Sequence, residues 1–131
     1  MVSELEGIIR QSTFSVVDGA YIYAKVAAFP ANGDHFLVTK DSDEITVVTR
    51  AEYVSALSLI ERNKDEYALV ALNVSIPFYS VGFIAAVSAA IADKGMNILV
   101  VSTYSKDYIL VMHDKLQEAI QVLINMGFSQ N

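Results

Sequence analysis

Two predicted strands in the second half of the chain, residues 69–72 and 98–101, are apolar at every position. Antiparallel strands with one face in water usually alternate apolar and polar residues, so both faces of these strands should be buried. The chain carries too few predicted helices to cover both faces of an antiparallel sheet. The second face is therefore expected to pack against the other half of the chain, or against another chain in a homo-oligomer (a dimer or larger). A tight helix–sheet core is the alternative explanation.

Length and composition exclude several classes of protein. The 131 residues fit one ordinary domain or two small ones, and the absence of cysteine excludes disulfides, thiolate nucleophiles and cysteine metal sites. A net charge of −6 argues against a nucleic-acid partner. The longest nearly apolar stretch, residues 81–92, is shorter than the roughly 18 residues that a membrane span needs. The first residues do not resemble a signal peptide, so we expect a cytoplasmic protein with no membrane partner.

The second half of the chain has the pattern of a β-α-β-β-α unit. Strands are expected at residues 67–74, 97–103 and 107–112. One helix should begin after Ser80 as the N-cap and end near Gly95. Asp114 and Gln117 have the spacing of a capping box and should begin the last helix, which ends before Gly127.

The first half resembles a shortened copy of the same unit. A short helix should begin at Ser3, and Asp18-Gly19 should form a turn. Strands are expected at residues 21–26, 35–39 and 44–48, followed by a helix at residues 49–61. At an offset of 63 residues, the strand that begins at Glu44 aligns with the strand that begins at Asp107. We therefore predict an α+β fold with two domains, residues 1–63 and 64–131, joined at a polar linker.

Few residues in the sequence suggest catalysis. His35 and His113 fall in different halves, with no acid spaced to orient either ring, and no nucleophile, zinc-protease or phosphate-binding motif occurs. Asp41, Asp43 and Glu44 could hold a hard cation, although a polar turn explains them more simply. We therefore expect no enzyme activity, no cofactor and no metal site.

A binding site is easier to argue in the second half. The loop and first helical turn at residues 75–83 should present free amide groups, which favour an anion. The hairpin places Asp107 near Ser102, Thr103 and Tyr104 in the same sheet. Amide donors for a carboxylate and an aspartate for an ammonium group are what an amino acid ligand requires. In the alternative reading, Gly82 only permits close packing and Asp107 only caps a turn.

Several segments carry a resemblance to the ACT domain family. These are residues 73–98 and the run Ser-Thr-Tyr-x-x-Asp-Tyr-Ile-Leu-Val at residues 102–111. The chain resembles most closely the tandem ACT type of small bacterial proteins and of the animal arginine sensors called CASTOR. The resemblance covers nearly the whole chain, closely from residue 67 to 112 and loosely before.

The resemblance implies tandem ferredoxin-like ACT units, each an antiparallel sheet with helices on one face. It also implies a non-enzymatic regulatory protein that binds a small amino acid or similar metabolite at a domain interface. The ligand-binding residues that it implies are Ser75, Phe78, Val81, Gly82, Phe83, Ser102, Thr103 and Asp107. The chain departs from the family pattern where a short loop around Pro30 replaces the helix of the first unit. A structural or protein–protein interaction module with a vestigial site is the alternative.

Overall fold

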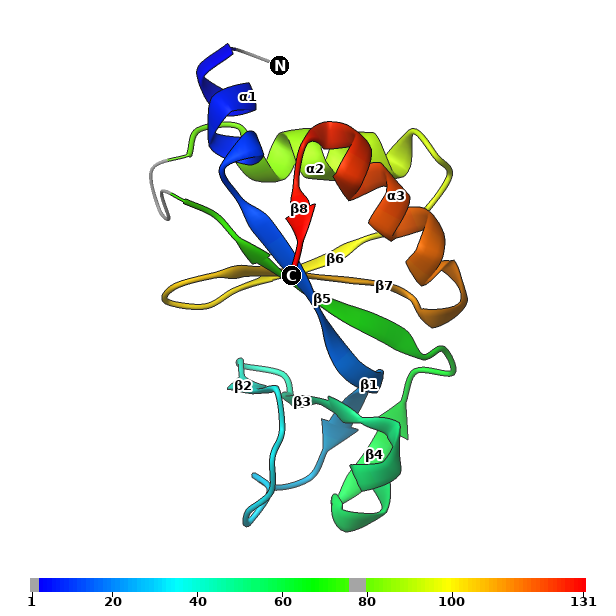
Figure 1. Ribbon diagram of the computed structural model, residues 1–131. Coiled ribbons are helices and arrows are strands. Elements are labelled where there is room, and N and C mark those ends of the chain that lie inside the picture. Colours follow the sequence, from blue (N-terminus) through cyan, green and yellow to red (C-terminus); the bar gives the residue numbers. More distant parts are fainter. Residues whose placement is uncertain (1–2, 76–79) are drawn as a thin grey trace. The chain divides into compact units, whose positions relative to one another are not determined.

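The computed structural model describes residues 3–75 and 80–131 (Figure 1). The chain forms two compact units: residues 1–18 with 68–131, and residues 19–67. These units differ from the division that we predicted between residues 63 and 64, because the first 18 residues belong to the same unit as the C-terminal half. Within the described residues, no helix combines the length and apolar character that crossing a bilayer requires.

The larger unit is an α+β structure. Its helices are α1 (Ser3–Arg10), α2 (Phe83–Ala92) and α3 (Leu116–Met126), with a 3-10 turn η2 (His113–Lys115) before α3. Its strands are the first part of β1 (Thr13–Val26), β5 (Tyr67–Asn73), β6 (Leu99–Ser102), β7 (Asp107–Met112) and β8 (Ser129–Gln130). The sheet order is β1-β5-β7-β6, with β8 parallel to the start of β1. The predicted β-α-β-β-α order of the second half is confirmed.

The N-terminal strand completes the sheet of the larger unit. β1 lies beside β5, on the side opposite β7, where the C-terminal half supplies only the two-residue β8. Phe14 of β1 is fully buried in the core that α2, α3, β5 and β7 form. Its ring meets Phe128 edge-on at 6.4 Å between centroids. The C-terminal half therefore depends on residues from the other end of the chain for a closed core.

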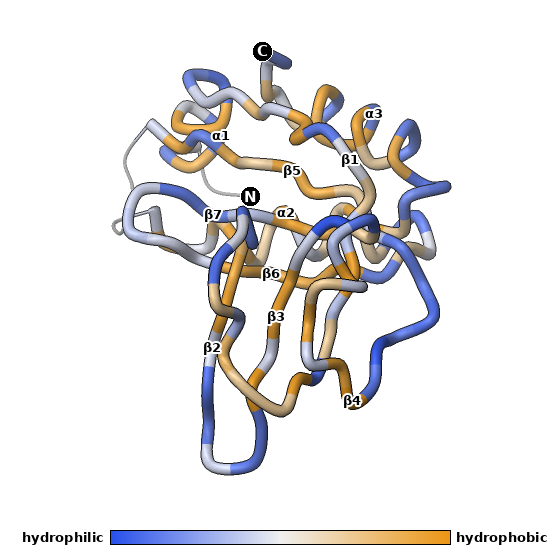
Figure 2. The backbone as a smooth tube through the Cα atoms, turned by 90° about the horizontal axis from the view of Figure 1, so that it is seen from below, coloured by the Kyte–Doolittle hydropathy of each residue, from blue (hydrophilic) through white to orange (hydrophobic). Residues whose placement is uncertain are grey.

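The expectation of two-faced burial is confirmed for β5, whereas β6 is only partly covered within one chain. Val70 and Leu72 pack in the helix-covered core, and Leu69 on the opposite face is also buried. Figure 2 colours β5 and β7 hydrophobic along most of their length. β6 lies at the edge of the sheet, where Val100 is 39% exposed.

The smaller unit is a short antiparallel sheet. It contains the second part of β1, β2 (Leu37–Lys40), β3 (Ile45–Arg50), the 3-10 helix η1 (Ala51–Ala56) and β4 (Leu59–Arg62). β3 and β4 both pair with β1, and β2 pairs with the outer side of β3. Ile22, Ala24, Val26 and Val47 form its core.

Two local predictions in the smaller unit are wrong. Residues 49–61 form η1 and β4 in place of one helix. Thr49 does not cap η1, because its side chain is fully buried and its Oγ1 lies 2.9 Å from Nδ1 of His35. Asp18-Gly19 is not a turn but lies inside β1, where Gly19 has a φ of +105° and leaves room for the side chain of Arg50. Both errors arise from contacts with residues distant in sequence.

Two predicted helix caps in the larger unit are also wrong. α2 begins at Phe83 with Gly82 as its N-cap, and Ser80 lies two residues further back. α3 begins at Leu116 after η2, with Lys115 as the N-cap and no capping hydrogen bond from a side chain. The predicted end of α3 is confirmed, since Gly127 follows it in the left-handed conformation. A 3-10 turn thus occupies the place of the expected capping box.

Replacing Phe14 by alanine tests whether the N-terminal strand is part of the larger unit's core. We expect Phe14→Ala to lower the free energy of unfolding by about 3–5 kcal/mol, because the cavity removes contacts with Phe128 and its neighbours. Phe29→Ala is the matched control, since Phe29 is 57% exposed and its loss should change stability by less than about 1 kcal/mol. Urea unfolding measures the free energy of unfolding of both variants. Equal losses of stability would contradict the placement of Phe14 in the core of the larger unit.

Candidate functional site

A pocket of about 400 Å³ lies in the larger unit, between the start of α2 and the turn that joins β6 to β7. Its volume falls within the range typical of small-molecule sites. The walls come from the end of β5, the first turn of α2 and the β6–β7 hairpin. The residues that line it are Val74, Ser80, Gly82, Phe83, Ile84, Ala85, Ser102, Thr103, Tyr104, Ser105, Lys106 and Asp107.

The helix side of the pocket offers backbone donors. The amide of Phe83 donates to the carbonyl of Ser80, and that of Ala86 donates to Gly82. Between them, the amides of Ile84 and Ala85 have no acceptor among the described residues. Free amides at the start of a ten-residue helix favour a negatively charged group, because they point outward and share the positive end of the helix dipole.

Gly82 is required by its backbone conformation. Its φ is +81°, a value that glycine adopts readily and other residues rarely do. Among the described residues, a Cβ at this position would meet only Cδ2 of Leu5, at 3.7 Å, which is an ordinary contact. Close helix–strand packing, the alternative reading of this glycine, is therefore not the reason for it. The left-handed residue turns the chain into α2 and directs its first amides to the pocket.

The hairpin side of the pocket carries the acid. Ser102 and Asp107 are paired across β6 and β7, and the Ser102 hydroxyl donates to Oδ1 of Asp107 at 2.6 Å. The turn between them is closed by Thr103, whose amide and hydroxyl both donate to the carbonyl of Lys106, at 2.8 and 3.2 Å. Asp107 Oδ2 has no partner among the described residues, so one carboxylate oxygen is held and the other can accept from a ligand.

The structure brings together five of the eight predicted binding residues. Those that line the pocket are Gly82, Phe83, Ser102, Thr103 and Asp107. Phe78 lies outside the described residues. Ser75 and Val81 do not line the pocket: the Ser75 amide donates to the hydroxyl of Ser12, and Val81 is 90% exposed.

Lining residues absent from our predicted set are mostly sequence neighbours of predicted ones. They are Val74, Ser80, Ile84, Ala85, Tyr104, Ser105 and Lys106. The loop that opens a helix and the turn of a hairpin each contribute consecutive residues, so contiguity is the signal that could have found them. The sequence had indicated Tyr104 only as a neighbour of Asp107.

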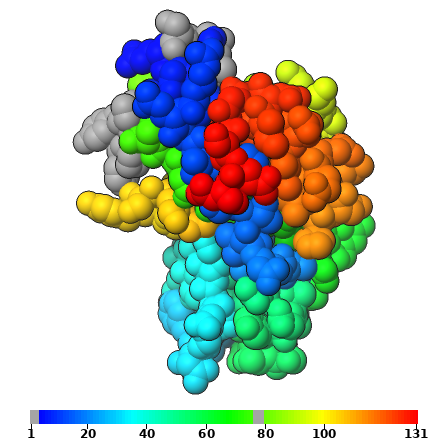
Figure 3. Space-filling model, in the orientation of Figure 1, coloured from blue at the N-terminus to red at the C-terminus, as the bar shows by residue number. Residues whose placement is uncertain are grey.

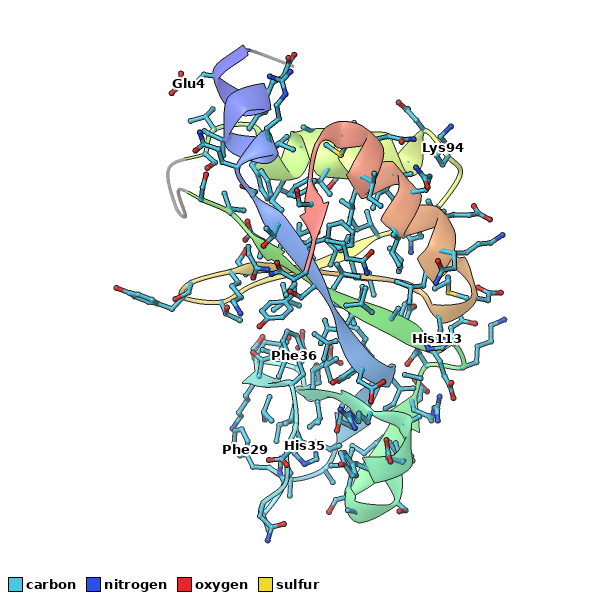
Figure 4. The ribbon with its side chains drawn as sticks, viewed as in Figure 1. Glu4, Phe29, His35, Phe36, Lys94 and His113 are labelled. Carbon is cyan, nitrogen blue, oxygen red and sulfur yellow. The ribbon has the colours of Figure 1, made fainter. Side chains whose placement is uncertain are left out.

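The two histidines, labelled in Figure 4, belong to different units. In the smaller unit, His35 contacts the Thr49 hydroxyl through Nδ1 and the Asn32 carbonyl through Nε2 at 3.2 Å. His113 is exposed at the end of β7. Neither ring lines the pocket.

The acidic turn before β3 is explained by its backbone. Asp41 Oδ1 accepts from the amides of Asp43 and Glu44, at 2.8 and 3.0 Å, which confirms the predicted turn. Within residues 3–75 and 80–131, no three histidine, aspartate or glutamate side chains gather as metal ligands would.

A second, shallower groove of about 230 Å³ lies on the sheet of the smaller unit. Glu44, which aligns with Asp107 in the sequence repeat, lines it and lies 3.9 Å from Nζ of Lys25. Its other walls come from β1, β3 and β4, with no helix start among the residues that line it. Burial, and the nearby charge of Tyr67, raise the pKa of Tyr23 in this groove. The groove is therefore not a second copy of the larger pocket.

Residues 63–125 match the ACT domain family. The match covers β5 to α3, and so includes every described residue that lines the pocket. It confirms a resemblance to the ACT domain for these residues. A search of curated proteins finds no match.

Solved structures show the same fold. A protein of unknown function from Vibrio cholerae, described as a possible transport protein, has a TM-score of 0.78 and 24% identity, over 95% of this chain and 96% of its own. A protein from Agobacterium tumefaciens has a TM-score of 0.69 and 22% identity, over 92% of both chains. The regulatory subunit of aspartate kinase from Thermus thermophilus has a TM-score of 0.59 and 10% identity, over 88% of this chain and 95% of its own. These similarities establish an ACT-like, ferredoxin-like fold.

Replacing Gly82 by alanine tests the conformation that opens the pocket. We expect Gly82→Ala to destabilise the protein by about 1–2 kcal/mol, because alanine is strained at positive φ. Gly7→Ala is the matched control: Gly7 lies inside α1 with open space around it, so alanine should be neutral or stabilise by up to about 1 kcal/mol. Urea unfolding measures both variants, and changes of opposite sign in the free energy of unfolding would support this role of Gly82. A neutral Gly82→Ala would contradict it.

Proposed function

We propose that this protein is a non-enzymatic regulatory protein that senses a small amino acid or a similar metabolite in the pocket at the start of α2. The observation that carries the proposal is that two helix amides without an acceptor among the described residues and a carboxylate line one cavity. The ACT domain match and the likeness to a regulatory subunit of aspartate kinase support a regulatory, ligand-sensing role.

The pocket residues suggest how an amino acid binds. Its carboxylate accepts from the amides of Ile84 and Ala85, where the helix dipole favours negative charge. Its ammonium group donates to the free oxygen of Asp107, whose other oxygen Ser102 holds in place. Charge-assisted hydrogen bonds of this kind are stronger than neutral ones, so the two ends of a zwitterion match the two sides of the pocket.

We further propose that the chain is a tandem ACT protein of the type that includes the CASTOR sensors. The second compact unit and the aligned acids Glu44 and Asp107 support a shortened first copy. A homo-oligomer in the cytoplasm is part of this proposal. The exposed edge strand β6, where Val100 is 39% exposed, is consistent with association of copies.

The proposed lack of enzyme activity is supported by the side chains that line the pocket. Its acid, Asp107, is accompanied by hydroxyls and one lysine, and neither histidine of the chain lines the pocket.

Protein–protein interaction is the second candidate function. It is favoured by β4, where Leu59 and Ile60 are 41% and 59% exposed.

A thermal-shift screen against the twenty amino acids tests the proposal. A ligand at 100 times its Kd should add about 2.7 kcal/mol of stability, which raises the Tm by a few degrees. Asp107→Asn should abolish this response without unfolding the protein, because it removes the charge and keeps the shape. Asp93→Asn, the same change at the exposed far end of α2, should keep the response. No response to any amino acid would favour the interaction module, and a normal response in Asp107→Asn would exclude this site.

A further inference from the structure

The rim of the pocket carries one large, exposed side chain. Tyr104 lines the pocket from the β6–β7 turn and is 86% exposed. Figures 1 and 3 show the hairpin extending away from the helices of its unit. Apolar surface in water is stabilised by any partner that covers it, in proportion to the area removed from solvent.

The hairpin turn holds Tyr104 in this position. Thr103 and Lys106 flank Tyr104 and Ser105 in the turn. Thr103 closes the turn with two hydrogen bonds to the carbonyl of Lys106. The Ser102–Asp107 hydrogen bond joins the strands directly below the turn. The turn is therefore organised by its own backbone, and it presents the tyrosine ring at the same cavity as the acid.

The volume of the pocket exceeds what the smallest amino acids fill. At roughly 30 Å³ for each water-sized group, 400 Å³ holds about a dozen such groups. Glycine or alanine would occupy only about half of that space. Part of the lining is apolar and consists of Val74, Phe83 and Ile84. A large apolar or aromatic side chain can thus fill the cavity and reach Tyr104.

We infer that Tyr104 determines ligand specificity: the site takes an amino acid with a large apolar or aromatic side chain, which packs on the Tyr104 ring. This inference rests on the proposed function and narrows its ligand class. The ends of the zwitterion bind the amides of α2 and Asp107, and the side chain of the ligand covers the exposed ring. Tyrosine suits such a contact, because it supplies a rigid apolar face at low cost in side-chain entropy.

Isothermal titration with L-phenylalanine, L-leucine and L-alanine tests this inference on the full chain. L-Phenylalanine and L-leucine should bind at least about tenfold more tightly than L-alanine, since burying a large apolar side chain contributes more binding free energy than burying the methyl group of alanine. Tyr104→Ala should weaken the binding of L-phenylalanine about tenfold and that of L-alanine less than about twofold, because only the large side chain of the ligand reaches the ring. Tyr104→Phe should keep the preference. Tyr53→Ala removes a tyrosine that is 36% exposed in η1 of the smaller unit, and it should change the affinity for neither amino acid.

The outcomes separate this inference from the proposed function. If amino acids bind but Tyr104→Ala weakens all three equally, or if a charged amino acid binds best in the full set of twenty, the specificity role is wrong and the sensor remains. If no amino acid binds, both are wrong. Thermal unfolding of each variant distinguishes a loss of binding from a loss of folding.

Discussion

Three phenylalanine rings connect the ends of the chain to the start of the helix that forms the pocket. Phe14 of β1 meets Phe128 near the C-terminus, and Phe128 meets Phe83, the first residue of α2, at 5.8 Å between centroids. All three rings are buried in one core. Aromatic pairs in edge-on geometry stabilise a core beyond the area that they bury. The position of the first turn of α2 therefore depends on an N-terminal strand more than sixty residues away in sequence.

From this anchor the pocket follows in a few steps. Phe83 holds the helix start in the core, and the left-handed Gly82 directs the chain into it. The amides of the next two residues remain without acceptors among the described residues, and both residues line the cavity. Opposite them, the paired strands β6 and β7 fix Asp107 against Ser102. The helix start thus supplies hydrogen-bond donors on one side of the pocket. The serine–aspartate pair supplies an acceptor on the other side, and a tyrosine lies at the rim.

Much of the larger unit could be predicted because its signals are local. Capping residues aside, the order of strands and helices after residue 67 follows from apolar runs and glycines, and Ser102, Thr103 and Asp107 follow from the hairpin. The smaller unit was harder, since Asp18-Gly19 has the sequence of a turn but lies inside β1. The side chain of Arg50 packs against Gly19, with Nε 3.0 Å from where a Cβ would stand. Such contacts between distant residues carry no local signal, and the same holds for Thr49 and His35. The exposure of Tyr104 likewise depends on how the hairpin is placed.

Amide chemical-shift mapping by NMR tests most directly whether this cavity is the binding site. The assigned protein would be titrated with each of the twenty amino acids, and the shifts of the backbone amides would be followed. We expect one or more amino acids to shift the amides of Ile84 and Ala85 together with those of Ser102, Thr103 and Asp107, because these groups line one pocket from its two sides. Shifts confined to the smaller unit, or no shifts with any amino acid, would contradict the account.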